Sequence, residues 1–246
     1  MANPHRETAV SALVDEDWRG AGDAYTRAAH RALGDGDDGD VLAPSARDRP
    51  ADGLASLLTA SLCYRVAGLT DRARFRALTA APLAMDFREY VRSGVARAVC
   101  QEFVADAAVL RGATDTAGEA YDRAASLYHE HTPSDPLDVS TDPIFEAANR
   151  LILHASRNTG LDVEWDDLHG TDPDDASYLA HRATFKRERF PRIVDAVEGA
   201  GFLHVPRGST EYNNGTYRCP DCDGHDVNYV GGETVCLDCS VRVETR

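Results

Sequence analysis

The sequence predicts a mostly α-helical protein that ends in a small β module. Residues 1–132 are rich in Ala, Arg and Leu, which favour helices, and their apolar positions recur at helical spacing. Residues 131–143, HTPSDPLDVSTDP, contain three prolines and interrupt this pattern. Residues 206–246 instead contain short runs of strand-forming residues, turn glycines and two Cys-x-x-Cys pairs. These observations predict a helical region, a linker and a separate C-terminal unit.

Length and composition limit the class of protein. A chain of 246 residues can bury a sizeable core, and an apolar fraction of 43% is typical of folded proteins. There is no apolar run of about 18 residues, the length that spans a bilayer. The first residues lack the basic start and apolar stretch of a secretion signal. We therefore expect a cytoplasmic protein without a membrane partner.

The charge balance is unusual. Lys186 is the only lysine among 26 basic residues, and the net charge is −15. Such a surface repels itself at ordinary ionic strength, but in molar salt the Debye length is only about 3 Å. The scarcity of lysine and the excess of aspartate resemble proteins of halophilic archaea. This resemblance implies that the acidity reflects a salt-rich cytoplasm and not a basic partner.

Two stretches of the N-terminal region share a pattern of small and aromatic residues. Residues 21–33, AGDAYTRAAHRAL, and residues 117–129, AGEAYDRAASLYH, place Ala, Tyr and Ala at positions i, i+4 and i+7. These positions share one helix face, so a neighbouring helix can approach the small residues while the ring fills the groove. Between these stretches, the sequence predicts one helix that ends near Gly68 and a second that begins at Thr70 or Asp71.

This pattern resembles the tetratricopeptide repeat, an antiparallel helix pair, over roughly residues 5–131. The family's period is 34 residues, whereas 52 residues separate Ala21 from Ala73 and 44 separate Ala73 from Ala117. Longer helices and an inserted loop would account for the excess, as in the looser helical arrays of vesicle-fusion adaptor proteins. The resemblance implies an antiparallel helical-repeat array in residues 1–132. An ordinary helical bundle with Ala-rich seams is the alternative.

Residues 133–143 are expected to form a linker, and residues 144–205 a helical extension of two further helices. Asp172 and Pro173 are expected to open the second of these helices. Pro191 lies inside it and is expected to kink or split it, because proline cannot donate the backbone hydrogen bond of a helix interior.

Two acidic segments are interpreted as exposed, solvated loops. Residues 34–50, GDGDDGDVLAPSARDRP, contain turn residues but lack the glutamate that a calcium-binding EF-hand loop carries at its twelfth position. Their aspartates are Asp35, Asp37, Asp38 and Asp40. The second segment offers four carboxylates that could bind a cation, although a solvated loop is the preferred interpretation: Asp162, Glu164, Asp166 and Asp167.

The C-terminal module offers a set of soft metal ligands. Four thiolates suit tetrahedral zinc, and these are Cys219, Cys222, Cys236 and Cys239. Two disulfides are disfavoured in a chain without a secretion signal, and a thioredoxin-type redox pair would need a βαβ context. An iron–sulfur or rubredoxin-like iron site uses similar spacing and remains open. The two other cysteines, Cys63 and Cys100, lie on apolar helical faces and are expected in the core.

The segments between these cysteines predict a particular fold. Gly231–Gly232 is a two-residue hairpin signal, and Asn214–Gly215 suggests a second hairpin leading into the first knuckle. Strand, knuckle, hairpin and knuckle together resemble a zinc ribbon over about residues 208–246. The resemblance implies one structural Zn²⁺, although Asp223 and Ser240 stand where the family often places glycine after a knuckle. A site closed by four cysteines has no open position for substrate, so it points to structure and not to hydrolysis.

No motif of a common enzyme class is present, so we expect a non-enzymatic protein. The first hypothesis is an interaction scaffold in which the helical array docks a protein partner and the zinc ribbon provides a second contact surface. The alternative is a nucleic-acid- or ribosome-associated protein of transcription or translation, since zinc ribbons occur in such proteins. Its local support is HRATFKRERFPR, with the basic residues Arg182, Lys186, Arg187, Arg189 and Arg192. The other interpretation of this run is a solvated helix whose arginines pair with the acidic loop before it.

Overall fold

The computed structural model describes residues 3–34 and 49–246. The aspartates of the first acidic loop, which invited a calcium interpretation, lie outside the described residues. Helices form most of the described chain, as predicted: α1 (Pro4–Val14), α2 (Trp18–Leu33), α3 (Arg49–Val66), α4 (Thr70–Asp86), the π-helix η2 (Phe87–Val91), α5 (Ala96–Leu110), α6 (Thr114–Glu130), α7 (Pro136–Ser140), α8 (Pro143–Ser156), the 3₁₀ helix η3 (Trp165–Leu168) and α9 (Ala180–Ala200).

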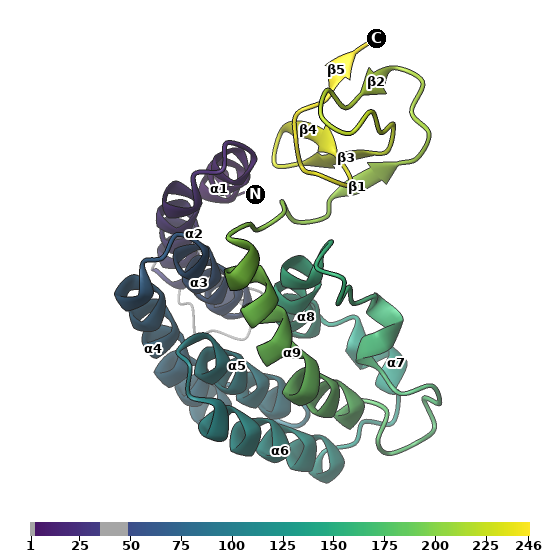
Figure 1. Cartoon of the computed structure of the whole chain (residues 1–246). Coiled ribbons are helices and arrows are strands. Elements are labelled where there is room, and N and C mark those ends of the chain that lie inside the picture. The colour runs from purple at the N-terminus through teal and green to yellow at the C-terminus, as the bar shows by residue number, and fades with distance from the viewer. Residues whose placement is uncertain (1–2, 35–48) are drawn as a thin grey trace.

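Helices α1 to α6 follow one another along an arc, each packed against the next (Figure 1). The predicted break between α3 and α4 is confirmed, because α3 ends at Val66 and α4 begins at Thr70. The segment 133–143 contains the short helix α7, which begins at Pro136 behind the capping side chain of Asp135.

The small and aromatic residues that the sequence singled out form the seams between these helices. Their side chains are buried at Ala21, Tyr25, Ala28, Ala73, Ala77, Ala80, Ala117, Tyr121 and Ala124. Helices α2 and α3 approach so closely that a Cβ atom on Gly22 would lie 2.7 Å from Cε1 of Tyr64. The tyrosine ring therefore occupies the space that the missing side chain leaves, which is how this seam fixes the spacing of the two helices.

Helices α8 and α9 lie on the inner side of the arc, against α3, α5 and α6 (Figure 1). The expected start of α9 is wrong, and so is the expectation that Pro191 could split it. It begins at Ala180, because Asp172 and Asp175 cap successive turns of the preceding segment through the backbone N–H groups of Asp174 and Ser177. It also continues through Pro191 to Ala200.

The helix continues past Pro191 because of its tertiary packing. Phe190, Ile193 and Val194 surround Pro191 in the sequence and are buried in the helical core. Their burial stabilises the helical path at the position where the backbone hydrogen bond is missing.

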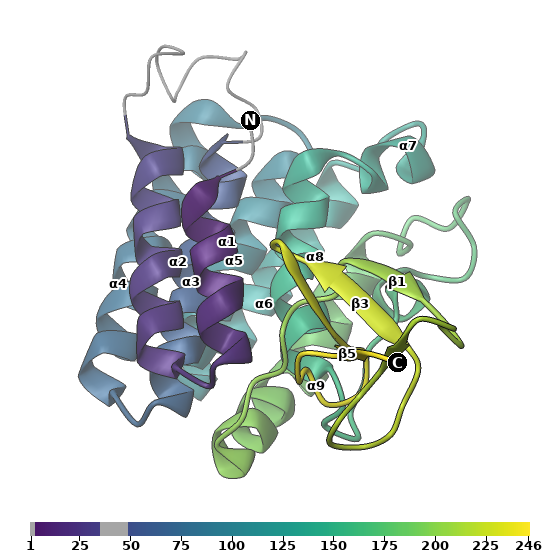
Figure 2. The same ribbon diagram turned by 90° about the horizontal axis from the view of Figure 1, so that it is seen from above.

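Residues 206–246, here called the β module, contain two small antiparallel sheets. The first has the strand order β1 (Ser209–Glu211), β3 (Val227–Val230), β4 (Glu233–Cys236), and the second pairs β2 (Tyr217–Arg218) with β5 (Glu244–Thr245). The module lies at the N-terminal end of the helical array, beside α1 and α8 (Figures 1 and 2).

A single cluster of buried apolar side chains extends from Ala9 in α1 to Val235 in β4. Helix α3 is buried along almost its whole length, so it is the centre of the helical array. In the described part of the chain, the helices are too short or too polar to cross a membrane.

Candidate metal centre

The structure brings all four predicted cysteines together. Their Sγ atoms lie within 4.8 Å of one another, and they form the only cluster of potential metal ligands among the described residues. Cys219 Sγ is 3.3 Å from Cys239 Sγ, and Cys222 Sγ is 3.5 Å from Cys236 Sγ. Four sulfurs held about 2.3 Å from one ion would be about 3.8 Å apart. The thiols are free and far beyond the disulfide bond length of about 2.05 Å.

The two knuckles have the same backbone hydrogen bonds. In the first, Cys219 N donates to Gly224 O (2.9 Å) and Asp223 N donates to Cys219 O (3.2 Å). In the second, Cys236 N donates to Val241 O (2.8 Å) and Ser240 N donates to Cys236 O (3.1 Å). Each Cys-x-x-Cys pair is thus closed by the same turn, which directs both of its sulfurs to one side.

Closing these turns requires a left-handed residue after the second cysteine. Asp223 and Ser240 adopt this left-handed conformation, with φ of 64° and 65°. Glycine would adopt it with less strain because it has no Cβ atom. Ser240 is buried, and its hydroxyl accepts a hydrogen bond from Val205 N at 3.2 Å. This bond gives the serine a role that glycine could not fill, since it ties the second knuckle to the chain that follows α9.

The predicted hairpin at Gly231–Gly232 is confirmed, because it joins β3 to β4 and places Val230 opposite Glu233. The second predicted hairpin is wrong. Strand β1 pairs with β3, and β2 pairs with β5, so the Asn214–Gly215 turn connects strands of different sheets. The Asn214 side chain accepts hydrogen bonds from Thr216 N and Tyr217 N, so it stabilises the turn within its own segment.

Burial and amide donors act differently on the four thiols. Burial opposes ionisation of Cys219, but the backbone N–H groups of Cys222 and Asp221 hold its pKa below the ordinary value. Burial raises the pKa of Cys236 to about 11 and also raises that of Cys239. Four thiolates this close repel one another, and a cation at their centre would remove that cost. The donor set therefore fits one metal ion.

Several contacts hold the β module against the helical array. Ser11 of α1 donates to Glu233 Oε1 at 2.7 Å, and Arg242 forms ion pairs with both Asp15 and Glu233. On the other side, Arg157 donates to the carbonyl of Leu237, within the second knuckle, at 2.6 Å. The metal cluster and the helices thus belong to one continuous structure.

Carboxylates of the second acidic segment accept hydrogen bonds within their own loop. Asp162 accepts a hydrogen bond from Asn158 N, and the side chains of Glu164 and Asp167 form a capping box around η3. These carboxylates therefore stabilise the loop through backbone N–H groups. His225 is outside the cysteine cluster and contacts the carbonyl oxygen of Tyr217 through Nδ1 at 3.2 Å.

The basic run in α9 is divided between the core and the surface, so the expectation of one exposed basic face is wrong for two of its members. Arg182 and Lys186 are fully buried because they lie on the helix face that packs against α5 and α8. Arg187, Arg189 and Arg192 remain exposed. Arg187 pairs with Asp122 of α6 at 3.2 Å, and not with the acidic loop before α9.

Sequence reasoning missed the partners of these buried cations, Glu102 and Asp106 of α5. Lys186 Nζ donates to Asp106 Oδ2 at 2.6 Å and to Glu102 Oε2 at 3.2 Å. Arg182 Nε lies 2.7 Å from Glu102 Oε1, an ion contact without the angle of a hydrogen bond. Two carboxylates spaced four residues apart in the apolar stretch AVCQEFVADAAVL were the available signal.

Sequence reasoning also missed a cavity of about 690 Å³ between the helices and the β module. Its lining residues come from distant parts of the chain, so no local pattern marks them.

Comparisons of the chain with protein-family models, curated proteins and solved structures found no match. The fold and the site by themselves define a helical protein whose C-terminal β module carries a four-cysteine cluster able to hold a metal ion.

Proposed function

We propose that the protein is a non-enzymatic interaction scaffold, built from a tetratricopeptide-like helical array and a zinc ribbon that holds one structural Zn²⁺. The observation that carries the proposal is an apolar strip on the outer face of α4. The scaffold would dock an apolar or amphipathic helix of another protein on this strip.

The strip is formed by side chains at helical spacing that point away from the core. Phe75 is 61% exposed, Leu78 40% and Met85 45%, and Pro82 between them is also exposed. Helix α4 packs on α3 and α5 through its alanines and lies at the outer edge of the array (Figure 1). Several exposed apolar side chains on one helix face of a highly charged protein are typical of a protein-binding face.

The inner face of the array is a less suitable docking surface. Helices α8 and α9 of the same chain already lie there, and buried ion pairs from α9 to α5 hold them in place. A partner would therefore approach the outer face, unlike the peptide in the groove of a regular repeat array.

The four thiolates support zinc as the resident ion of the β module. A small module of two- to four-residue strands has little apolar core of its own, and structural zinc contributes on the order of 10–16 kcal/mol to the folding of such units. With four protein ligands the ion has no open coordination position, which supports a structural and not a catalytic role.

Nucleic-acid or ribosome binding is the alternative, and the exposed arginines of α9 are what remains to support it. Arg182 and Lys186 already form buried ion pairs, and Arg187 is paired with Asp122. Only Arg189 and Arg192 of the original set remain exposed without an ion pair in the described part of the chain.

Affinity capture from a native-salt lysate, with and without nuclease, tests both functions. The full-length protein is compared with the double variant Phe75→Ser/Leu78→Ser and with a control, Leu137→Ser. Leu137 is 52% exposed on α7, far along the chain from the strip, so the control makes one of the two kinds of change at an exposed site outside the strip.

We expect a stoichiometric protein partner that survives nuclease, is captured by the control and is lost from the double variant. A partner captured equally by all three proteins would contradict docking on α4. Loss of the captured material after nuclease would favour the nucleic-acid alternative. Circular dichroism and zinc content should be the same in all three proteins, which shows that each is folded.

A further inference from the structure

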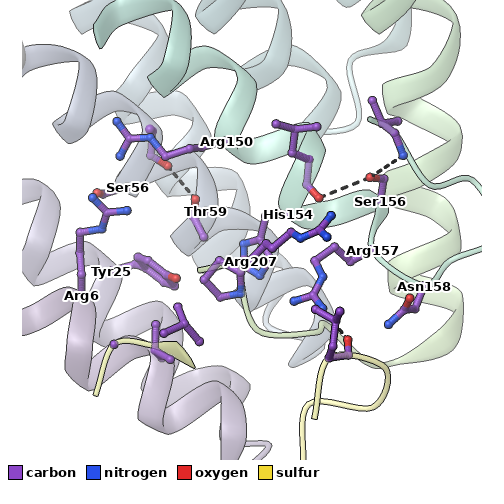
Figure 3. A pocket seen from close by; sticks show the side chains of 18 of the residues that line it. Arg6, Tyr25, Ser56, Thr59, Arg150, His154, Ser156, Arg157, Asn158 and Arg207 are labelled. Atoms are coloured by element: carbon purple, nitrogen blue, oxygen red, sulfur yellow. Dashed lines mark hydrogen bonds between the residues drawn. The ribbon is translucent and has the colours of Figure 1, made fainter. Parts of the chain in front are cut away.

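The cavity between the helical array and the β module has the size of a small-molecule site. It measures about 690 Å³ and lies where α1, α2, α3 and α8 meet the loop after α8 and the β3–β4 hairpin (Figure 3). Cavities that bind small ligands are typically about 300–1,000 Å³ and combine apolar walls with a few convergent polar groups. Both features are present here.

Tyr25 supplies a polar group without a partner. Its side chain is 5% exposed, and its hydroxyl points into the cavity in Figure 3. This hydroxyl forms no hydrogen bond with any described residue. Burial, the largest effect, raises the pKa of Tyr25, so the hydroxyl stays protonated and can donate. The hydroxyl is therefore available to donate to a ligand or to water in the cavity.

Positive charge gathers around this hydroxyl. Arg6 of α1, Arg150 within α8, Arg157 directly after α8, and Arg207 of the β module all line the cavity (Figure 3). Arg150 pairs with Asp52 at 2.5 Å, but the other three form no ion pair among the described residues.

The three arginines without an ion pair differ in the hydrogen bonds that hold their side chains. Arg157 is held by the carbonyl oxygens of Val205 and Leu237, and Arg207 donates to the hydroxyl of Tyr212. The side chain of Arg6 has no partner within the described chain. In a protein of net charge −15, unpaired guanidinium groups around one cavity indicate an anionic occupant.

Four carboxylates also line the cavity, but two of them already accept hydrogen bonds. Glu7, Asp162, Glu164 and Asp238 are exposed, as are Arg6 and Arg207. Asp162 already accepts a backbone hydrogen bond from Asn158, and Glu164 caps η3. His154 adds no charge at neutral pH, because burial lowers its pKa to about 4 and its Nε2–H donates to His204 O at 2.6 Å.

Apolar side chains from both parts of the molecule form part of the walls. They are Val10, Ala55, Leu153, Val163, Trp165, Val230 and Leu237. An inorganic anion alone would leave these surfaces wet, so the ligand that fits has an apolar body as well as a charged group.

We propose that this cavity binds a small organic anion, whose oxyanion group is held by Arg6, Arg207 and the Tyr25 hydroxyl and whose body packs on the apolar walls. Because Arg207, Val230 and Leu237 belong to the β module, the complete site exists only while the module is docked on the helices. The ligand would therefore stabilise the docked arrangement of the two parts.

Binding of 8-anilinonaphthalene-1-sulfonate to the full-length protein tests this proposal. Trp165 lines the cavity, and Trp18 is the only other tryptophan, so in a Trp18→Phe background the quenching of Trp165 fluorescence reports occupancy. The matched neutral probe is N-phenyl-1-naphthylamine, which has the same rings without the sulfonate. The double variant Arg6→Gln/Arg207→Gln removes two exposed cations of the site, and Arg189→Gln is its surface control.

We expect saturable binding of one sulfonate probe, at least about 10-fold tighter than the neutral probe. The double variant should lose this preference, and Arg189→Gln should keep it. Octanoate and octyl phosphate should displace the probe, and the stronger of the two identifies the anionic group.

Equal affinity for the two probes, no displacement by either anion, or a preference that survives the double variant would overturn the proposal. Quenching that is abolished by Leu78→Ser on α4 but not by the arginine changes would also overturn it, because the probe would then occupy the apolar strip. Tyr25→Phe, which leaves the charges intact, should weaken binding of the sulfonate probe without affecting binding of the neutral probe.

Discussion

Lys186, the only lysine of the chain, is fully buried, and its ammonium group donates to Asp106 Oδ2 at 2.6 Å. Around this contact, Tyr121 donates to Asp106 at 2.5 Å and Tyr128 donates to Glu102. Burial opposes the charge on Glu102, but Arg182 and Lys186 lower its pKa below the ordinary value. Two cations of α9 and two carboxylates of α5 therefore balance each other in the core.

Removing one charge from this network should be costly. We predict that Lys186→Met lowers the free energy of unfolding by about 3–5 kcal/mol, because Asp106 loses its cation inside the core. The double variant Lys186→Met/Asp106→Leu should recover most of that loss, and Arg189→Gln on the surface should change stability by less than about 0.5 kcal/mol. Urea unfolding followed by circular dichroism measures all three. A double variant no more stable than Lys186→Met would refute the charge-balance explanation.

Metal removal should affect the two parts of the protein differently. We predict one zinc per chain by elemental analysis, with loss of the ion in Cys239→Ser and full retention in His225→Asn, since His225 lies outside the cluster. A chelator should unfold residues 208–246 while most of the helical signal persists, because the helices have their own buried core. One iron per chain by elemental analysis would contradict zinc as the resident ion. Loss of the whole helical signal after chelation would contradict the separate unfolding of residues 208–246.

The tip of the β3–β4 hairpin should control docking of the module. Gly231 and Gly232 both have positive φ, but only at Gly231 would a Cβ atom meet Val10 of α1, 2.7 Å from its Cβ. We predict that Gly231→Ala increases hydrogen exchange in α1, whereas Gly232→Ala strains only the hairpin itself. Equal exchange in the two glycine variants would contradict the contact.

Buried histidine should make the protein sensitive to acid. Burial lowers the pKa of His154 from 6.5 to about 4, so below pH 6.5 the unfolded chain takes up a proton that the folded chain does not. We predict a loss of up to about 3 kcal/mol of unfolding free energy between pH 6.5 and pH 4 that is absent in His154→Gln. The difference between wild type and variant isolates this effect from proton competition at the cysteines. A difference that does not change with pH would argue against it.

The net charge of −15 predicts a dependence on salt. We expect the free energy of unfolding to rise between 0.1 M and 2 M potassium chloride, because screening removes repulsion among surface carboxylates. Chloride screens charge without the strong salting-out effect of sulfate, so it is the appropriate salt. Stability that is flat or falling over this range would count against adaptation to a salt-rich cytoplasm.

Local patterns in the sequence were sufficient for much of the structure. Alternating small and aromatic residues such as Ala21 and Tyr25 predicted the helical seams, and Gly231–Gly232 predicted a hairpin, because these features depend on neighbours a few residues apart. The pairing of β1 with β3 could not be predicted in this way. The Asn214–Gly215 turn favours a local hairpin, and strand pairing across a longer separation overrides it.

The sequence by itself determined that the chain is mainly helical and that four cysteines converge at its C-terminus, since helix periodicity and knuckle spacing act over a few residues. Tertiary structure alone decided which charges are buried and which are exposed. The arginines of α9 look alike in the sequence, but Arg182 faces Glu102 in the core while Arg189 faces solvent. It also decided that Arg6, Tyr25 and Arg207 meet around one cavity. Contacts between residues so far apart depend on how the helices and the module pack, which no local pattern encodes.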